Sequence, residues 1–307
     1  MTEFFKPDRK LIDILKEESF TISAEVIPPR NGTPQNKVFE ELQGLITAGA
    51  QFISVTKGAG GSLRGGSLPI AQSIKDHFKR PAIAHFTCRD LTPQDVENQL
   101  MDHHYVGIRN ILALRGDPPR DLPDWKPLEG SYSYAYQLIE QIRKLNQGQF
   151  LERPNFKTST AMNTDFCIGA AAYPDEPNPM ARKEHFAAKV RAGAEYAITQ
   201  MIYDVDSYSR FLEEISAMNC SVPILPGARI LSSQEQADRM RNRFQIPIPD
   251  KVYAKLPTEE TQSEQALEVF LKLVEGLKAA GAPGLHVFVL TDTDLACRAL
   301  RNLVTQS

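Results

Sequence analysis

The stretch Asn110–Pro119 (NILALRGDPP) places an arginine, a glycine and an aspartate directly after a short apolar run. Such a run bounded by turn residues predicts a fully buried strand, and the two prolines stop further sheet pairing. Arg115 and Asp117 would then lie at the carboxyl end of this strand, beside Gly116, which lets a ligand approach the backbone. In parallel α/β folds ligands bind at that end, so we interpret the stretch as a candidate site; a solvated Arg–Asp pair in a turn is the alternative.

A second candidate is Glu25, a carboxylate among apolar neighbours in the segment SAEVIPPR. Burial raises the pKa of a carboxyl group, and a carboxyl that stays protonated near neutral pH can act as a general acid. The alternative is a structural ion pair, with Arg30 or Arg115 as the partner.

Further polar residues lie in or just after other apolar runs. They are Thr56, His85, Tyr173, Gln200, Arg229 and His286. A lone histidine in an apolar strand is more often a hydrogen-bonded core residue than a catalyst, but polar side chains that recur at strand ends fit the rim of a barrel active site. The set includes no convincing zinc-ligand trio and no nucleophile elbow, so we expect no metal. The glycine-rich stretch Gly58–Gly66 lacks the Lys-Ser/Thr ending of a P-loop and is either a mobile loop or a lid or cofactor edge.

Apolar runs that predict strands alternate with amphipathic patterns that predict helices. The strand ranges are Ile22–Ile27, Phe52–Thr56, Ala82–Cys88, Asn110–Arg115, Cys167–Tyr173, Tyr196–Tyr203, Pro223–Gly227 and Leu285–Leu290. The helix ranges are 7–17, 36–48, 68–79, 93–105, 132–147, 180–192, 206–218, 232–242, 259–280 and 292–303. This order predicts an α/β protein, a single (β/α)8 TIM barrel over residues 1–307 with a short N-terminal helix. The alternative is an open doubly wound sheet, but no GxGxxG motif follows the first strand.

Composition narrows the class of protein. The 307 residues are 42% hydrophobic and 24% charged, which is ordinary for a globular protein. The formal net charge of −3 argues against a broad nucleic-acid or acidic-lipid surface. No apolar run approaches the roughly 18 residues of a membrane span, and the N-terminus lacks a signal-peptide core. The four cysteines are far apart, so we expect reduced thiols in a cytoplasmic protein.

Taken together, these segments resemble a known family. SAEVIPPR, FISVTKGAG, AIAHFTCRD, GIRNILALRGDPP, AAYPDEPNP, AGAEYAITQMIYD and LPGARIL follow in the order found in the catalytic domain of methylenetetrahydrofolate reductases. The resemblance covers about residues 20–303 and is specific only in combination. It is to the bacterial type, which consists of the catalytic domain alone.

The resemblance implies a barrel that holds FAD at the carboxyl ends of its strands, with NADH or NADPH as the electron donor. Reduced flavin would pass hydride to methylenetetrahydrofolate in one-carbon metabolism. By motif position, Glu25 would be the general acid, and Asp117 would tune the flavin and bind folate. The residues that would line the flavin are Thr56, His85, Arg115, Gly116, Asp117 and Tyr173, and Lys189 would contact its phosphates. Gln200 and Gln236 would contact folate or nicotinamide.

The chain departs from the family pattern after Tyr173, where PDEPNPMARKEH lacks the usual His-Pro-Glu and is shorter before Lys189. That region holds the adenine half of FAD in the family, so FMN or a weakly held flavin stays open. Departures at Lys57, Met240 and Asp292 leave the electron donor open between NADH, NADPH and a partner protein.

Two other functions stay open from the sequence. One is a pterin-binding barrel that transfers methyl groups without redox chemistry, and the other is a non-catalytic barrel subunit that binds folate. The presence of Glu25, Asp117 and Gln200 together argues against the second. The resemblance also implies that the protein works as a homo-oligomer or with a partner subunit, while the physiological direction of the reaction stays open.

Overall fold

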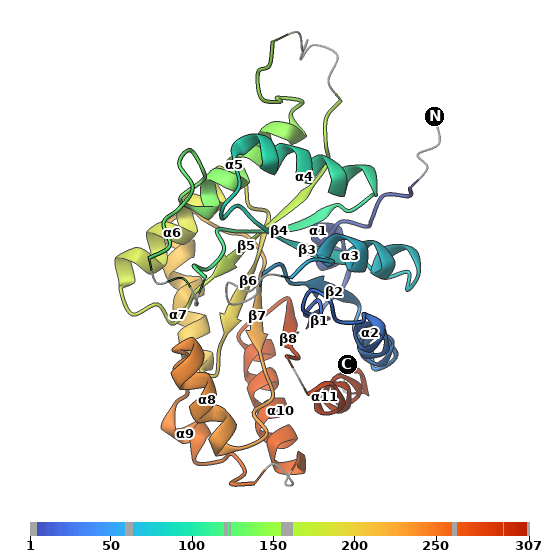
Figure 1. Cartoon of the computed structure of the whole chain (residues 1–307). Helices are drawn as coiled ribbons and strands as arrows, with labels where there is room; N and C mark the ends of the chain where they lie inside the picture. Colours follow the sequence, from blue (N-terminus) through green and yellow to red (C-terminus); the bar gives the residue numbers. More distant parts are fainter. Residues whose placement is uncertain are drawn as a thin grey trace.

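The computed structural model of the chain describes residues 5–58, 64–119, 122, 124–154, 162–259, 263–290 and 292–305. Eight parallel strands form a closed barrel in chain order, and helices surround it (Figure 1). Residues 59–63 of the glycine-rich stretch Gly58–Gly66 lie outside the described ranges. The predicted (β/α)8 barrel is therefore confirmed, and the open-sheet alternative is wrong.

The strands are close to their predicted ranges. They are β1 (Thr21–Val26), β2 (Phe52–Val55), β3 (Ala82–Thr87), β4 (Asn110–Leu114), β5 (Cys167–Ala172), β6 (Tyr196–Met201), β7 (Ile224–Ala228) and β8 (Gly284–Phe288). Pairing of β1 with both β2 and β8 closes the ring. Most strands end one or two residues earlier than predicted.

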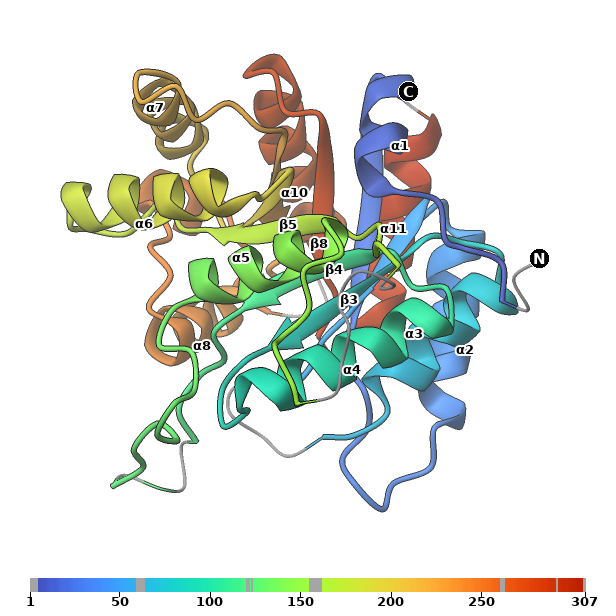
Figure 2. The same cartoon turned by 90° about the horizontal axis from the view of Figure 1, so that it is seen from above.

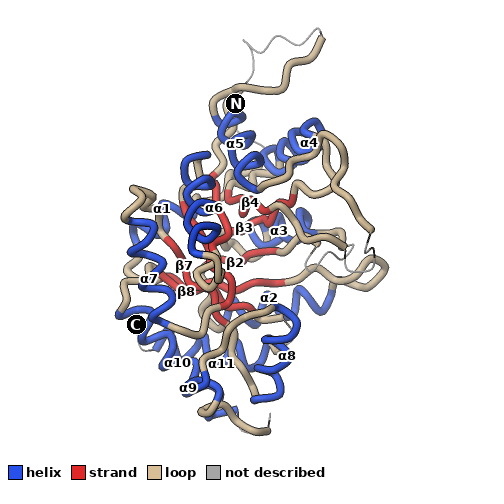
Figure 3. The backbone as a smooth tube through the Cα atoms, turned by 90° about the vertical axis from the view of Figure 1, so that its left-hand side faces the viewer, coloured by secondary structure: helices blue, strands red, loops and turns tan. Residues whose placement is uncertain are grey.

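The helices form a layer outside the strands (Figures 2 and 3). They are α1 (Leu11–Glu17), α2 (Asn36–Thr47), α3 (Ser67–Asp76), α4 (Pro93–Tyr105), α5 (Ala135–Asn146), α6 (Pro179–Ala192), α7 (Val205–Ser216), α8 (Gln234–Phe244), α9 (Asp250–Tyr253), α10 (Ser263–Ala279) and α11 (Thr293–Thr305). The short α9 was not predicted. The first helix begins at Leu11 and not at residue 7, because Asp8 is tied to the barrel: its carboxylate accepts the N–H of Ala82 at 2.8 Å. None of the helices described is long and apolar enough to cross a membrane.

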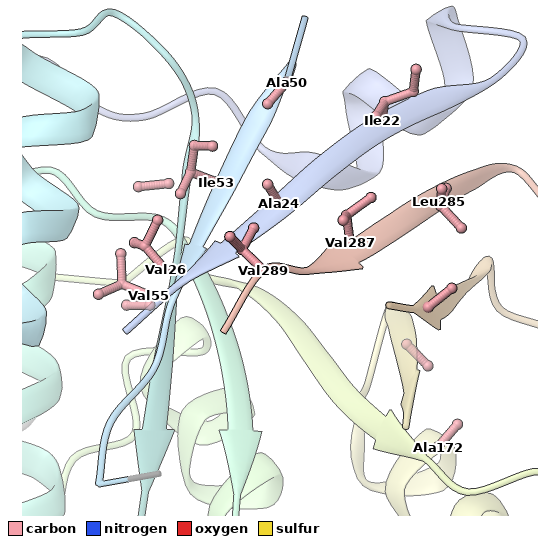
Figure 4. Close-up of a cluster of buried hydrophobic side chains, with 14 of the residues drawn as sticks. Ile22, Ala24, Val26, Ala50, Ile53, Val55, Ala172, Leu285, Val287 and Val289 are labelled. Carbon is pink, nitrogen blue, oxygen red and sulfur yellow. The ribbon is translucent and has the colours of Figure 1, made fainter. Parts of the chain in front are cut away.

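Alternation along each strand separates two cores, since successive side chains point to opposite faces. One set packs outward against the helices; on β1 these residues are Ile22, Ala24 and Val26 (Figure 4). The other set points into the barrel. At the amino ends of the strands this inner set is apolar and includes Phe52, Ile83 and other residues, with Leu11 and Ile14 of α1 packed onto it. Helix α1 therefore closes that end of the barrel.

The opposite end of the barrel interior is polar. Continuing the inward alternation on β1 gives Ser23 and then Glu25, and the register pairs Glu25 with Ser54 on β2 and Ser23 with His286 on β8. Neighbouring residues in register point to the same side of a sheet, so these side chains face one another. The fold thus places the polar inward residues near the carboxyl ends of the strands. The four cysteines are buried and form no disulfide bond within the described ranges.

Candidate active site

Glu25 lies inside the barrel near its carboxyl-end rim, with 6% of its surface exposed. Burial raises the pKa of this carboxyl from 4.5 to about 8. The physical cause is loss of hydration, which disfavours the charged form. At neutral pH the group therefore keeps its proton, and a protonated carboxyl is a hydrogen-bond donor and a possible general acid.

His85 on β3 is the neighbour of Glu25. Its Nε2 lies 3.7 Å from Oε2 of Glu25, and burial lowers the pKa of the imidazole to about 4. Both groups are neutral at pH 7, so the contact joins two uncharged polar groups and is not a salt bridge. The alternative ion pair is wrong: within the described ranges neither Arg30 nor Arg115 lies within 4.0 Å of the Glu25 carboxyl.

A second polar layer lies beneath this pair. His286 on β8 places Nδ1 2.8 Å from Ser23 Oγ and Nε2 3.2 Å from Ser54 Oγ. Burial, followed by the proximity of His85, lowers the pKa of His286 to about 3. Sequence reasoning noted His286 but gave no role to Ser23 and Ser54. Their signal was the alternation itself, since Ser23 precedes Glu25 by two positions and therefore shares its face.

The Arg115–Asp117 segment follows β4, as predicted, and both charged side chains are exposed. Gly116 adopts φ +92°, and a Cβ there would lie 2.9 Å from the Cβ of Arg89 and 3.3 Å from that of Thr87. Glycine is thus required by the left-handed backbone and by the close approach of the β3–α4 segment. This is a different reason from the ligand approach that the sequence suggested.

Tyr173 and Lys189 lie beside this segment, at the end of β5. The Tyr173 ring is 48% exposed, and desolvation of its hydroxyl followed by the charge of Asp117 raises its pKa, while Arg115 lowers it. Lys189 extends from α6 to the rim, where Nζ donates to the carbonyl of Ala171 at 2.8 Å and lies 5.1 Å from the Tyr173 ring centre. Burial lowers the pKa of Lys189 to about 8.

The two glutamines occupy different settings. Gln200 lies half-buried on β6, next to a break in the β6–β7 register, and its Oε1 accepts the N–H of Met201 at 3.0 Å. Gln236 is on α8, with its Oε1 accepting the N–H of Ser232 at 2.9 Å. The structure therefore places Glu25 beside His85, and it places Asp117 close enough to Tyr173 for its charge to affect the tyrosine pKa. The hydrogen bonds of Gln236 in the described ranges are with residues at the start of its own helix.

Two buried polar atoms of the rim fit a bound group. The Oγ1 of Thr56, just after β2, and the Nε2 of His85 make no hydrogen bond within the described part of the chain. Buried polar atoms are normally satisfied, so unpaired ones indicate a missing partner. At the same end of the barrel, half-exposed Tyr173 after β5 offers a flat aromatic surface, and Lys189 uses one of its three N–H donors. These features fit a planar heterocycle that carries an anionic tail. No group of three His, Cys, Asp or Glu residues in the described ranges is arranged to hold a metal.

A parallel barrel with titratable residues gathered at the carboxyl ends of its strands defines the class of (β/α)8 barrel proteins that bind small molecules at that rim. Comparison with known families places the chain within this class. The family profile described as methylenetetrahydrofolate reductase matches residues 10–304, and the chain belongs to that family.

Curated relatives agree with this assignment. The chain is 29% identical to 5,10-methylenetetrahydrofolate reductase of Escherichia coli over 285 residues, covering 90% of this chain and 88% of that protein. It is 29% identical to methylenetetrahydrofolate reductase 1 of Schizosaccharomyces pombe, covering 89% of this chain and 44% of that protein. Methylenetetrahydrofolate reductase (NADH) 1 of Arabidopsis thaliana is 26% identical, with 96% and 50% covered. The chain thus spans about half the length of the fungal and plant relatives.

Solved structures share the fold at low sequence identity. An uncharacterised protein from Clostridium thermocellum that binds two copies of 5-methyl-5,6,7,8-tetrahydrofolic acid has a TM-score of 0.59 at 16% identity, covering 96% of this chain and 99% of that one. Oxaloacetate acetylhydrolase has a TM-score of 0.51 at 12% identity, covering 97% and 84%. These likenesses support the barrel architecture.

Proposed function

We propose that the chain is a flavin-dependent oxidoreductase that interconverts 5,10-methylenetetrahydrofolate and 5-methyltetrahydrofolate. Family membership supports the reaction. The observation that carries the proposal is Glu25, a carboxyl that burial keeps protonated to about pH 8 beside the rim of the barrel. Opening the five-membered ring of the substrate requires a proton at one of its nitrogens, and a carboxyl with this pKa still holds a proton at neutral pH.

In this proposal Glu25 acts at the bond between the methylene carbon and a ring nitrogen. Its proton moves to that nitrogen, the C–N bond breaks, and the remaining nitrogen and carbon form an iminium. A hydride then adds to the iminium carbon and gives the methyl group. His85 stays neutral at 3.7 Å from the carboxyl, so it does not hold Glu25 in its charged form by ion pairing.

FAD, when bound, would carry hydride between reduced nicotinamide and the substrate carbon. Thr56, His85, Arg115, Gly116 and Tyr173 would hold its ring system, since two of them bring unpaired buried polar atoms and one an aromatic face. Lys189 would contact its phosphates with the N–H donors that the Ala171 carbonyl leaves over.

Asp117 and the two glutamines would orient the substrate. The Asp117 carboxylate is exposed next to Tyr173, so it can accept hydrogen bonds from the pterin. We assign Gln200 and Gln236 to folate or nicotinamide. Gln200 is half-buried on a barrel strand, whereas the side-chain oxygen of Gln236 already accepts a backbone N–H, which leaves its amide group as donor.

We propose NADH as the electron donor, because the plant relatives carry that donor in their names; NADPH is the second choice. The tetrahydrofolate substrate agrees with the ligand of the Clostridium thermocellum barrel. We keep FMN or a weakly held flavin as alternatives to FAD, and a homo-oligomer or an electron-transfer partner as the assembly.

An anaerobic spectroscopic experiment tests this function. Purified protein loaded with FAD is mixed separately with NADH, NADPH and 5-methyltetrahydrofolate while the flavin absorbance is followed. The proposal predicts bleaching by one nicotinamide and by 5-methyltetrahydrofolate. A protein that takes up no flavin, or whose flavin is bleached by neither, would favour the methyl-transfer or non-catalytic alternatives instead.

A further inference from the structure

A cleft lies outside the barrel, between α10, α9, the start of α7 and the segment that follows β7. Its volume is about 200 Å³, and one side is open to solvent. This is smaller than a typical site for a drug-sized molecule, so the cleft has room for a small ligand only. We call it the α9–α10 cleft; these helices lie together in the orange to red part of the chain (Figure 1). None of the residues assigned above to flavin or folate lines it.

The walls of the α9–α10 cleft are largely apolar. Val269 and Leu273 lie four residues apart on α10, so both face the same side of the helix, and both stay half-buried. Leu231 after β7 and Leu256 after α9 form the buried part of the wall. Aliphatic side chains left partly exposed inside a concave surface favour an apolar ligand body.

The charged residues of the cleft are mainly cationic. Among the residues that the structure describes, Arg229, Lys251, Lys255 and Lys272 line it together with Asp204 and Asp206, which gives these lining groups a formal charge of +2. Lys251 is neutralised locally, with Nζ 3.3 Å from Asp204 and 3.6 Å from Asp206.

The other cationic residues of the cleft differ in their ion-pair partners. Lys272 pairs with Glu268 at 2.6 Å, outside the lining. Lys255 forms no ion pair within the described ranges, so its charge stays available to a ligand. A cleft with apolar walls and surplus positive charge is complementary to a ligand that has an apolar body and a negative charge.

We infer that the α9–α10 cleft binds a small organic anion with an aromatic or aliphatic body, which packs on Val269 and Leu273 and pairs its anionic group with Lys255. The site is separate from the rim of the barrel and does not depend on the proposed reaction. A neutral molecule of the same shape would gain the apolar contacts but not the charge pairing, so it would bind more weakly.

Two fluorescent probes that differ in one charged group test this inference. 8-Anilinonaphthalene-1-sulfonate is anionic, and N-phenyl-1-naphthylamine is the same aromatic framework without the sulfonate. Both are titrated into the FAD-loaded protein and into Lys255→Glu and Val269→Trp. Lys16→Glu and Val304→Trp are the matched controls: Lys16 is a 70% exposed lysine on α1, and Val304 is a 48% exposed valine on α11.

The inference predicts saturable binding, tighter for the anionic probe. Lys255→Glu should weaken the anionic probe about tenfold at low ionic strength and leave the neutral probe unchanged. Val269→Trp should abolish saturable binding of both by filling the cleft, while neither control changes them. Equal affinity of the two probes, no saturable binding, or binding of the anionic probe that survives both cleft substitutions would overturn the inference.

Discussion

At the scale of single residues, one carboxyl group determines most of the chemistry. Glu25 was found from sequence because a carboxylate inside an apolar run must be buried or paired. The arginine partners considered in the ion-pair alternative were wrong, since the run does not show which strand faces Glu25. His85 comes from β3 and lies 60 positions away in the chain, and only closure of the barrel brings its Nε2 to 3.7 Å. Ser23 and Ser54 were passed over because a serine in a strand is common.

Glu25 predicts a specific dependence of stability on pH. Burial raises its pKa from 4.5 to about 8, so the folded protein holds this proton more tightly than the unfolded chain. The free energy of unfolding should therefore fall as pH rises through this window. Glu25→Gln removes the titration and should gain about 4 kcal/mol relative to wild type between pH 5 and pH 9.

Urea unfolding at pH 5, 7 and 9 measures this difference. Glu129→Gln, at an exposed position, is the control and should follow the wild-type curve at every pH. Parallel curves for wild type and Glu25→Gln would show that Glu25 titrates normally in the folded protein.

At the scale of elements, periodicity predicted nearly every strand and helix, but not the details that depend on contacts across the chain. The four-residue α9 is too short to show a repeat. The carboxyl end of β6 was predicted to run on to Tyr203, but its register with β7 shifts between Ile198 and Met201. The hydroxyl of Thr199 fills the gap by accepting the N–H of Gly227 at 2.8 Å. A side chain that completes a sheet in this way leaves no periodic signal.

Gly116 gives the prediction at this scale. Gly116→Ala should lower the free energy of unfolding by about 2–4 kcal/mol, because it adds a left-handed non-glycine residue and a Cβ 2.9 Å from that of Arg89. Gly130→Ala is the matched control, since Gly130 has φ +78° and a Cβ added there would meet no atom within 4 Å. It should cost only about 1 kcal/mol.

Chemical denaturation of Gly116→Ala and Gly130→Ala separates the cost of a left-handed backbone from the cost of crowding by the added Cβ atom. Equal losses would mean that the approach of Arg89 and Thr87 contributes nothing, and that only the backbone angle requires glycine at position 116.

At the scale of the whole molecule, the alternation of strands and helices was sufficient to predict the barrel. It did not predict how α1 closes the amino end. Asn110, which begins β4, accepts the N–H of Leu11 at 2.6 Å and donates to the carbonyls of Arg9 and Ala82. The sequence showed only an asparagine before an apolar run. Its role depends on where the N-terminal segment returns to the barrel.

Asn110→Ala should therefore destabilise the protein by about 3 kcal/mol, because two hydrogen bonds to the N-terminal segment and one to Ala82 of β3 are lost. Hydrogen exchange should speed up in residues 11–17 before the rest of the chain. Asn302→Ala, which removes one bond on α11, is the control and should cost about 1 kcal/mol. Unchanged exchange in α1 would show that apolar packing alone holds it.

The proposed reaction depends most directly on the proton of Glu25, and its two half-reactions can be measured separately in Glu25→Gln. In the anaerobic stopped-flow spectrometer, reduction of the bound flavin by NADH should proceed at nearly the wild-type rate, because that step needs no proton donor to folate. Reoxidation of the reduced flavin by 5,10-methylenetetrahydrofolate should slow by at least about a hundredfold. Reoxidation at the wild-type rate would contradict the assignment of Glu25 as the general acid.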